Sequence, residues 1–355
     1  MEKLVYGSAF LGGGGGGDLR IGLEIGRRII DLGGVRILPI EQIDQETLLI
    51  TLSVVGPQSI ETWSSSRLLA NLIRVVRLLE RFLGEEIGGL ISSEIGAVNT
   101  LAPFPASVAL DIPVVDAPCN GRAHPTVLMG SMGLHRLPSY RTVLAASWQT
   151  REEEIGEAIL RGSLEEVVSI LRSIVSVRGS VATARNPIKA SYVARNGAPG
   201  SVKLALEIGD IFHRYRHEPE EISHKLLERY RGFLVSNCLA IDKFSEIREN
   251  LDYGVIYAKC GDKNYTLTYA NEYMYLESSE GVVSVFPDLI STIDPVTGTP
   301  LLSKDIKTGM KFDIIVISRE NLKLGSGVKY PESYEQVNKA LGRDLRMYLK
   351  DLLIT

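Results

Sequence analysis

The chain has 355 residues, of which 45% are hydrophobic and 23% are charged, and its formal net charge is −4 at pH 7. This balance is typical of a globular protein with a sizeable core. Because we find no basic segment, no secretory pattern and no apolar run of roughly 18 residues, we expect no nucleic-acid partner, no membrane partner and a cytoplasmic location.

The first half of the chain alternates between helical and extended patterns. Apolar side chains at helical spacing predict a helix over Ile21–Gly33 and a longer one over Ser64–Gly84. Short apolar runs predict buried strands, which we place at Thr47–Gly56, Gly88–Gly96, Ile112–Pro118 and Val143–Trp148. Alternating strands and helices predict a mostly parallel sheet with helices on its faces.

From about residue 163 the pattern changes. Two further helical segments are followed, after Arg231, by closely spaced strands with turn sequences such as CGDK, which predict an antiparallel sandwich or barrel. The segment Tyr334–Leu353 has apolar side chains at helical spacing and predicts a helix that packs back onto the first domain. We therefore expect an α/β domain over residues 1–165, completed by residues 320–355, and a mainly β domain with some helices over 166–319.

Six consecutive glycines, Gly12–Gly17, precede Asp18 and the first predicted helix. They could be a flexible linker, a structural turn, or backbone that must come close to a ligand. A dinucleotide-binding loop is disfavoured, because no clear strand precedes the glycines. We favour a functional close approach, in which glycine N–H groups face an anion.

Polar residues at predicted strand ends form the candidate site, because ligands of open α/β sheets collect there. Glu94 ends one strand, and Asn99 follows it either as a ligand contact or as a helix cap. Asp116 ends another strand, and Arg122 either holds a substrate carboxylate or pairs with Asp116 to stabilise a loop.

Three further features of the sequence point less clearly to a site. Cys119 and His124 could be a nucleophile and its base, but a small buried thiol is the favoured interpretation. His213 and His217 are more typical of a solvated helix face than of a zinc site. The three cysteines are odd in number and far apart, which argues against a disulfide framework and favours reduced thiols.

The order of the motifs LGGGGGGD, EIGAVN, VVD-x4-GRA-x-P, NE and PDLI-x3-D resembles the S-methyl thiohydantoin desulfurase-like family over about residues 4–320. The resemblance implies a three-layer α/β/α domain and a smaller, mainly β domain. It also implies an association with hydantoinase and oxoprolinase proteins, which open cyclic amides. Transferred by motif, the site comprises Glu94, Asp116 and Arg122 as catalytic residues, and as ligand-binding residues Gly13, Gly14, Gly15, Gly16, Gly17, Asp18, Asn99, Gly121, Asn271, Glu272 and Asp288.

One departure from the family pattern is chemically important. The family commonly has a second acid before the GRA motif, where this chain has Pro118. Two functions therefore stay open: an enzyme that hydrolyses or desulfurises a hydantoin-like cyclic amide, with Glu94 or Asp116 activating water, and a non-catalytic binding subunit of a hydantoinase- or oxoprolinase-type enzyme. A small-molecule ligand is expected; the sequence identifies no cofactor, metal or oligomeric state.

Overall fold

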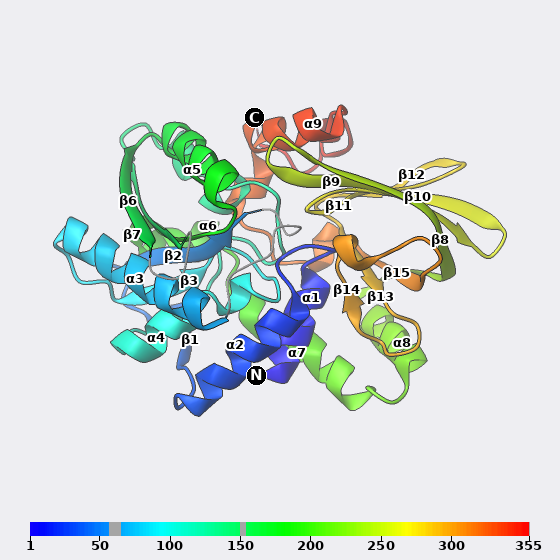
Figure 1. Cartoon of the computed structure of the whole chain (residues 1–355), viewed down its shortest axis with the longest axis horizontal. Coiled ribbons are helices and arrows are strands. Elements are labelled where there is room, and N and C mark those ends of the chain that lie inside the picture. Colours follow the sequence, from blue (N-terminus) through cyan, green and yellow to red (C-terminus); the bar gives the residue numbers. More distant parts are fainter. Residues whose placement is uncertain (57–64, 150–153, 355) are drawn as a thin grey trace.

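The structure is a computed structural model that describes residues 1–56, 65–149 and 154–354. It contains two sheets with their helices, which form two adjoining domains (Figure 1). Ser64, the predicted start of the longest helix, lies outside the described residues; the helix α3 is described over Ser65–Leu83.

The first sheet has seven strands in the described residues, in the order β1-β4-β3-β2-β7-β5-β6. The first four strands of this order pair in parallel, whereas β2, β7, β5 and β6 pair antiparallel. The prediction of a mostly parallel sheet was therefore wrong, because β5 and β6 form a hairpin and β7 runs against β2. The strands are β1 (Ile37–Pro39), β2 (Leu48–Val55), β3 (Gly89–Ser92), β4 (Val114–Asp116), β5 (Thr142–Gln149), β6 (Ile155–Gly162) and β7 (Val181–Lys189).

Alternate side chains of the first sheet enter different apolar clusters. On β2, Ile50 and Leu52 join the large cluster that contains α3, whereas Leu49 joins a cluster with α6 on the opposite face. Helix α5 covers the same face as α6 further along the sheet, beside β5 and β7. The remaining bounds are α1 (Glu2–Leu11), α2 (Leu19–Asp31), α4 (Phe104–Leu110), α5 (Leu164–Arg178), α6 (Ala190–Asn196), α7 (Ser201–Arg214) and α8 (Pro219–Tyr230).

The second sheet is antiparallel throughout, with eight strands among the described residues in the order β12-β11-β10-β9-β8-β15-β13-β14. It is the yellow and orange part of Figure 1. Its strands are β8 (Gly232–Arg248), β9 (Leu251–Cys260), β10 (Lys263–Ala270), β11 (Glu272–Ser278), β12 (Gly281–Val285), β13 (Leu289–Ile293), β14 (Pro300–Leu301) and β15 (Lys311–Ile317).

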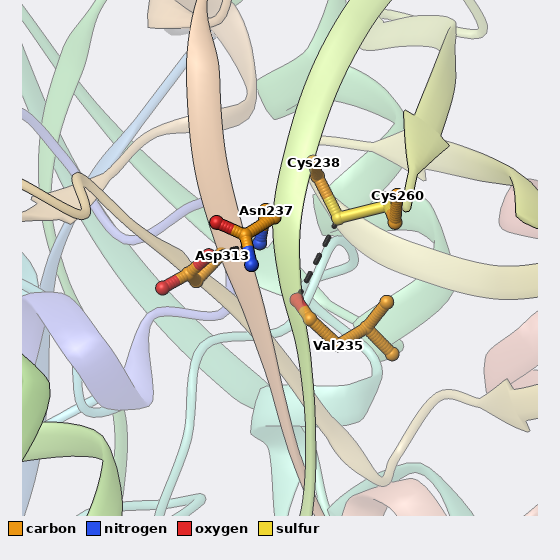
Figure 2. Close-up of a disulfide and its surroundings, with 5 residues drawn as sticks. All are labelled: Val235, Asn237, Cys238, Cys260 and Asp313. Atoms are coloured by element: carbon orange, nitrogen blue, oxygen red, sulfur yellow. Dashed lines mark hydrogen bonds between the residues drawn. A yellow bond between two sulfur atoms is a disulfide. The ribbon is translucent and has the colours of Figure 1, made fainter. Parts of the chain in front are cut away.

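A disulfide joins β8 to β9 (Figure 2). Cys238 and Cys260 occupy directly opposed positions of this antiparallel pair, so their side chains meet. Beside them, the Asn237 N–H donates to Asp313 Oδ1 of β15 at 2.8 Å. The prediction of reduced thiols was wrong for this pair, because the strand register that brings the two residues together could not be read from their spacing. Cys119 is free and buried.

The C-terminal segment differs from the predicted single helix. Helix α9 covers only Glu335–Leu341, because Gly342 adopts a left-handed conformation (φ +64°) and ends it. Its buried side chains Val337 and Leu341 pack in one cluster with Met274 and Phe286 of the second domain. The segment thus contacts the second sheet, and it also returns to the first domain, because Arg172 of α5 donates to Gln336 of α9 and Met129 lies in the same cluster. The first sheet itself extends past residue 165 to the end of β7.

Helix α1 was not predicted, and it precedes the glycines directly. It packs along α7 with a close backbone approach at Gly7 and Gly209, where an added Cβ would lie 1.8 Å and 1.6 Å from a carbonyl oxygen of the other helix. Its apolar residues belong to the cluster that also receives Leu289 and Ile315 from the second sheet. No helix in the described part of the chain is long and apolar enough to cross a membrane.

Candidate functional site

A cavity of about 380 Å³ lies where β2 and β3 end, and residues of both domains line it. Ser53 to Gly56 come from the end of β2, Ser93 and Glu94 follow β3, and Ser180 precedes β7. Asn271 and Glu272 contribute from the second domain. The sheet changes from parallel to antiparallel pairing between β2 and β7, so the cavity occupies a switch in strand direction at the carboxyl ends of parallel strands.

The glycine segment (Gly12–Gly17) forms one wall of the cavity and connects the two domains. The Gly13 carbonyl accepts a hydrogen bond from the Tyr273 N–H, and the Gly14 carbonyl accepts one from the Ser303 N–H, both at 2.9 Å. On the other side, the Gly16 carbonyl accepts from the Val98 N–H at 3.0 Å. The segment is therefore an ordered junction, and Gly16 and Gly17 line the cavity.

Side chains would not fit in the glycine segment. Four of its residues, Gly13, Gly14, Gly16 and Gly17, have positive φ angles that favour glycine. A Cβ on Gly16 would lie 2.5 Å from the Gly96 Cα, and a Cβ on Gly15 would lie 2.0 Å from Glu272 Oε1. The close approach is thus made to protein atoms, and it brings the Glu272 carboxyl against the backbone of the first domain.

Glu94 has defined hydrogen-bond partners on both of its carboxylate oxygens. Asn99 Nδ2 donates to Oε1 at 2.6 Å, and the His124 N–H donates to Oε2 at 2.9 Å. Asn99 is itself oriented, because its Oδ1 accepts from the Val54 N–H at 2.9 Å. Glu94 is 5% exposed and lines the cavity, so its carboxylate is oriented by the protein while it stays accessible to a small ligand.

Glu272 faces the same cavity from β11. Burial, and secondly the charge of Glu94, raise the pKa of Glu272 well above its usual range, although the Arg122 charge opposes this. Its Oε2 has no hydrogen-bond partner. Raised pKa values favour the protonated acid, so one carboxyl group at this site is suited to donate a proton while the other accepts one.

His124 and Arg185 complete the polar wall. Burial lowers the pKa of His124, which favours the neutral imidazole, and His124 Nε2 lies 3.5 Å from Glu94 Oε2. Arg185, on β7, is fully buried and donates through Nη1 to the hydroxyls of Ser53 and Thr183. Sequence analysis missed Arg185; the available signal was a charged residue inside the apolar run VATARN.

Asp116 and Gly121 lie outside this cavity. The Asp116 carboxylate accepts from the Val202 N–H at 2.7 Å and from the Lys203 N–H at 3.0 Å, so it binds the first turn of α7. Gly121 packs against another segment, where a Cβ would lie 2.0 Å from the Lys323 carbonyl oxygen. The structure therefore gives both residues contacts that stabilise the fold, although Asp116 ends β4 and Glu94 lies just after the end of β3.

Arg122 and Asp288 form part of the domain junction instead of lining the cavity. Arg122 is fully buried, donates to the carbonyl groups of Ala123, Pro287 and Asp288, and lies over the Phe286 ring at 4.7 Å. The Asp288 carboxylate accepts from Arg319 Nε at 2.8 Å. The planar guanidinium predicted to hold a substrate carboxylate thus contacts the backbone of the second domain.

The last candidates from the sequence fall at the edge of the site. Asp18 lines the cavity and caps α2, accepting from the Arg20 N–H at 2.8 Å. Asn271 lines it in a left-handed conformation (φ +63°) and accepts from the Asp252 N–H. Burial raises the pKa of the Cys119 thiol to about 11. Within residues 1–56, 65–149 and 154–354, no group of three or more His, Cys, Asp or Glu could hold a metal ion.

The raised pKa of Glu272 predicts a pH dependence of stability. A carboxyl group whose folded pKa exceeds its unfolded value of about 4.3 binds more protons when folded, so stability falls as pH rises between the two values. We expect Glu272→Gln to stabilise the protein relative to wild type by an amount that grows between pH 5 and pH 8. Thermal melts of both proteins across this range measure it; a gap that shrinks with pH would contradict the assignment.

Comparison with known proteins identifies a family for both parts of the chain. The family model described as "S-Me-THD-like, N-terminal domain" matches residues 1–152, and the corresponding C-terminal model matches residues 153–326. The second match begins inside the first sheet, so β6 and β7 belong to it. A crystal structure of a protein from Chromobacterium violaceum has the same fold, with a TM-score of 0.73 and 18% identity over 96% of this chain and 95% of that one. No curated protein matches the sequence.

Proposed function

Since this chain belongs to the S-Me-THD-like family, we propose that it is an enzyme that hydrolyses a small cyclic amide of the hydantoin or thiohydantoin type. The observation that carries this proposal is the pair of buried carboxyl groups, Glu94 and Glu272, which face one cavity from different domains. They are close enough for the charge of Glu94 to raise the pKa of Glu272. A carboxyl group with a raised pKa beside a second carboxyl group is suited to general acid–base catalysis.

In the proposed reaction Glu94 takes a proton from water, and the resulting hydroxide adds to the ring carbon of the substrate. The protonated Glu272 then gives its proton to the group that leaves this carbon. That group is the ring nitrogen when an amide opens, or methanethiolate when an S-methyl thiohydantoin loses its sulfur. The two hydrogen bonds to Glu94, from Asn99 and His124, orient its carboxylate for this role.

This assignment changes the roles expected from the sequence. The N–H groups of Gly13 and Gly15 donate to carbonyl groups of the chain, and the Gly16 N–H donates to Glu272, so these three N–H groups are already engaged. We therefore assign these three N–H groups to the fold and to Glu272 rather than to binding an oxyanion. Pro118, in place of a second acid, does not affect the proposal, because the second carboxyl group comes from β11.

The proposal is tested by incubating the purified full chain with hydantoin, 2-thiohydantoin and S-methyl-2-thiohydantoin. Mass spectrometry follows the ring-opened acid and the desulfurised product over time. We expect at least one of the three to be converted catalytically, with many turnovers per protein molecule. Saturable binding without product from any of them would instead support the alternative function, a binding subunit of a hydantoinase- or oxoprolinase-type partner.

A further inference from the structure

We propose that the wall of the cavity formed by β2 and β7 is a carboxylate subsite built on Arg185, so that the natural ligand carries a carboxylate in addition to its cyclic amide. This inference rests on the proposed function and narrows its substrate class from neutral to anionic cyclic amides. It depends on three observations: the polar surroundings of Arg185, the absence of an ion pair to it in the described part of the chain, and its free guanidinium edge.

A narrow polar strip crosses one face of the first sheet at this wall. Thr51 and Ser53 of β2 are paired with Arg185 and Thr183 of β7, so all four side chains point to the same face. The apolar clusters on this face lie to either side of the strip, one around α6 and the other around α5. Because polar residues interrupt an otherwise apolar sheet face where it meets a cavity, the strip has the character of a binding surface.

Arg185 forms no ion pair with an acidic side chain among the described residues, and the charge of Glu94 acts on it only from a longer distance. Arg185 is 1% exposed and lines the cavity, yet the ion pairs of the described part of the chain do not include it. Its hydrogen bonds are made by Nη1 alone, to two neutral hydroxyls. Buried charges are normally paired, so an unpaired guanidinium at a cavity wall indicates a place for an external anion.

The geometry of the free edge suits a carboxylate. Arg185 Nε is buried and has no hydrogen-bond partner, and the described residues give Nη2 none either. These two nitrogens lie on one edge of the guanidinium and carry the N–H donors that remain for a carboxylate at the cavity wall; two parallel hydrogen bonds require a carboxylate oxygen to reach the buried Nε. Arg122, which is also fully buried, has one nitrogen without a partner too, but carbonyl groups and the Phe286 ring contact the rest of its guanidinium and it does not line the cavity.

The first test compares two probes on the wild-type full chain. Hydantoin-5-acetate carries a carboxylate, whereas 5-methylhydantoin has the same ring without one. Isothermal titration calorimetry should find the carboxylate probe bound about 10- to 100-fold more tightly, the effect of charge-assisted hydrogen bonds. Equal affinities for the two probes would overturn the proposal, and this outcome needs no variant that folds.

The second test uses three variants. Arg185→Met should remove the preference for hydantoin-5-acetate and leave the affinity for 5-methylhydantoin unchanged. Arg185→Lys should keep only part of the preference, because an ammonium lacks the planar fork of a guanidinium. The control variant Arg161→Gln removes one positive charge from an exposed position of β6. It should leave the affinities for both probes within about twofold of wild type. A preference that survives in Arg185→Met, or that Arg161→Gln removes equally, would contradict a subsite at Arg185.

The thermal stability of the variant distinguishes a ligand-binding role of Arg185 from a structural one. Ser53 Oγ and Thr183 Oγ1 also hydrogen-bond to each other at 2.9 Å, so both keep a partner when Arg185 is replaced. We therefore expect Arg185→Met to melt within a few degrees of wild type. The binding measurement is independent of turnover. Tighter binding of hydantoin-5-acetate without any catalysis would refute only the proposed function. Equal binding of both probes, with turnover of both, would refute only the subsite.

Discussion

Glu94→Gln is expected to lower kcat/KM for the converted cyclic amide by about 10²- to 10⁴-fold, the usual contribution of a general base. Glutamine keeps the shape of the side chain but cannot take a proton from water. It can still accept one of the two hydrogen bonds that Asn99 and His124 donate to Glu94, although its amide nitrogen then faces the other donor. The measurement is steady-state kinetics with the substrate found in the panel, together with calorimetric binding of 5-methylhydantoin.

Binding of 5-methylhydantoin should change much less than kcat/KM, because a lost general base removes stabilisation of the transition state alone. Arg161→Gln is a matched control far from the chemistry and should retain wild-type kinetics. If Glu94→Gln lost binding and turnover in equal proportion, Glu94 would be a binding residue, and the assignment of a general base would be wrong.

Arg122→Met is expected to destabilise the protein by about 3 kcal/mol or more. It leaves the buried carbonyl groups of Pro287 and Asp288 without their donor and removes the cation over the Phe286 ring. It also removes the positive charge whose attraction partly opposes the raised pKa of Glu272. Urea unfolding followed by circular dichroism measures the effect, with the exposed Arg161→Met expected within about 0.5 kcal/mol of wild type.

The sequence-based hypothesis for Arg122 makes the opposite prediction, because it places the guanidinium on the ligand. A variant with wild-type stability and a large loss of affinity for hydantoin-5-acetate would support that hypothesis. A less stable variant that binds this probe normally at low temperature would support the junction role seen in the structure.

Much of the site could be predicted from the sequence, because the ends of the strands could be located there. Glu94 and Glu272 were both proposed, and the structure places them at one cavity although 178 positions, 94 to 272, separate them. Asp116 carries the same local signal as Glu94, an acid at the end of a buried strand, yet it binds α7. The difference depends on which distant helix reaches each strand end, and no local pattern contains that information.

The features that sequence analysis missed are also long-range. Arg185 is polar within an apolar strand, but the preference for an external anion follows only from its partners on β2, which strand pairing supplies. The disulfide depends on the register between β8 and β9. Helix α1 was missed and the C-terminal helix was predicted too long for a different reason, since contacts with α7 and the turn at Gly342 determine the extent of α1 and α9.

The pH dependence of kcat/KM in wild type and in Glu272→Gln tests the central claim most directly, because it asks whether a protonated Glu272 takes part in the reaction. A general acid must be protonated in the free enzyme, so wild-type kcat/KM should fall as pH rises through the raised pKa of Glu272. In Glu272→Gln this alkaline fall should disappear, and the remaining kcat/KM should be about 10²-fold lower than that of wild type. An unchanged alkaline fall, with a rate close to that of wild type, would contradict catalysis by this pair of carboxyl groups.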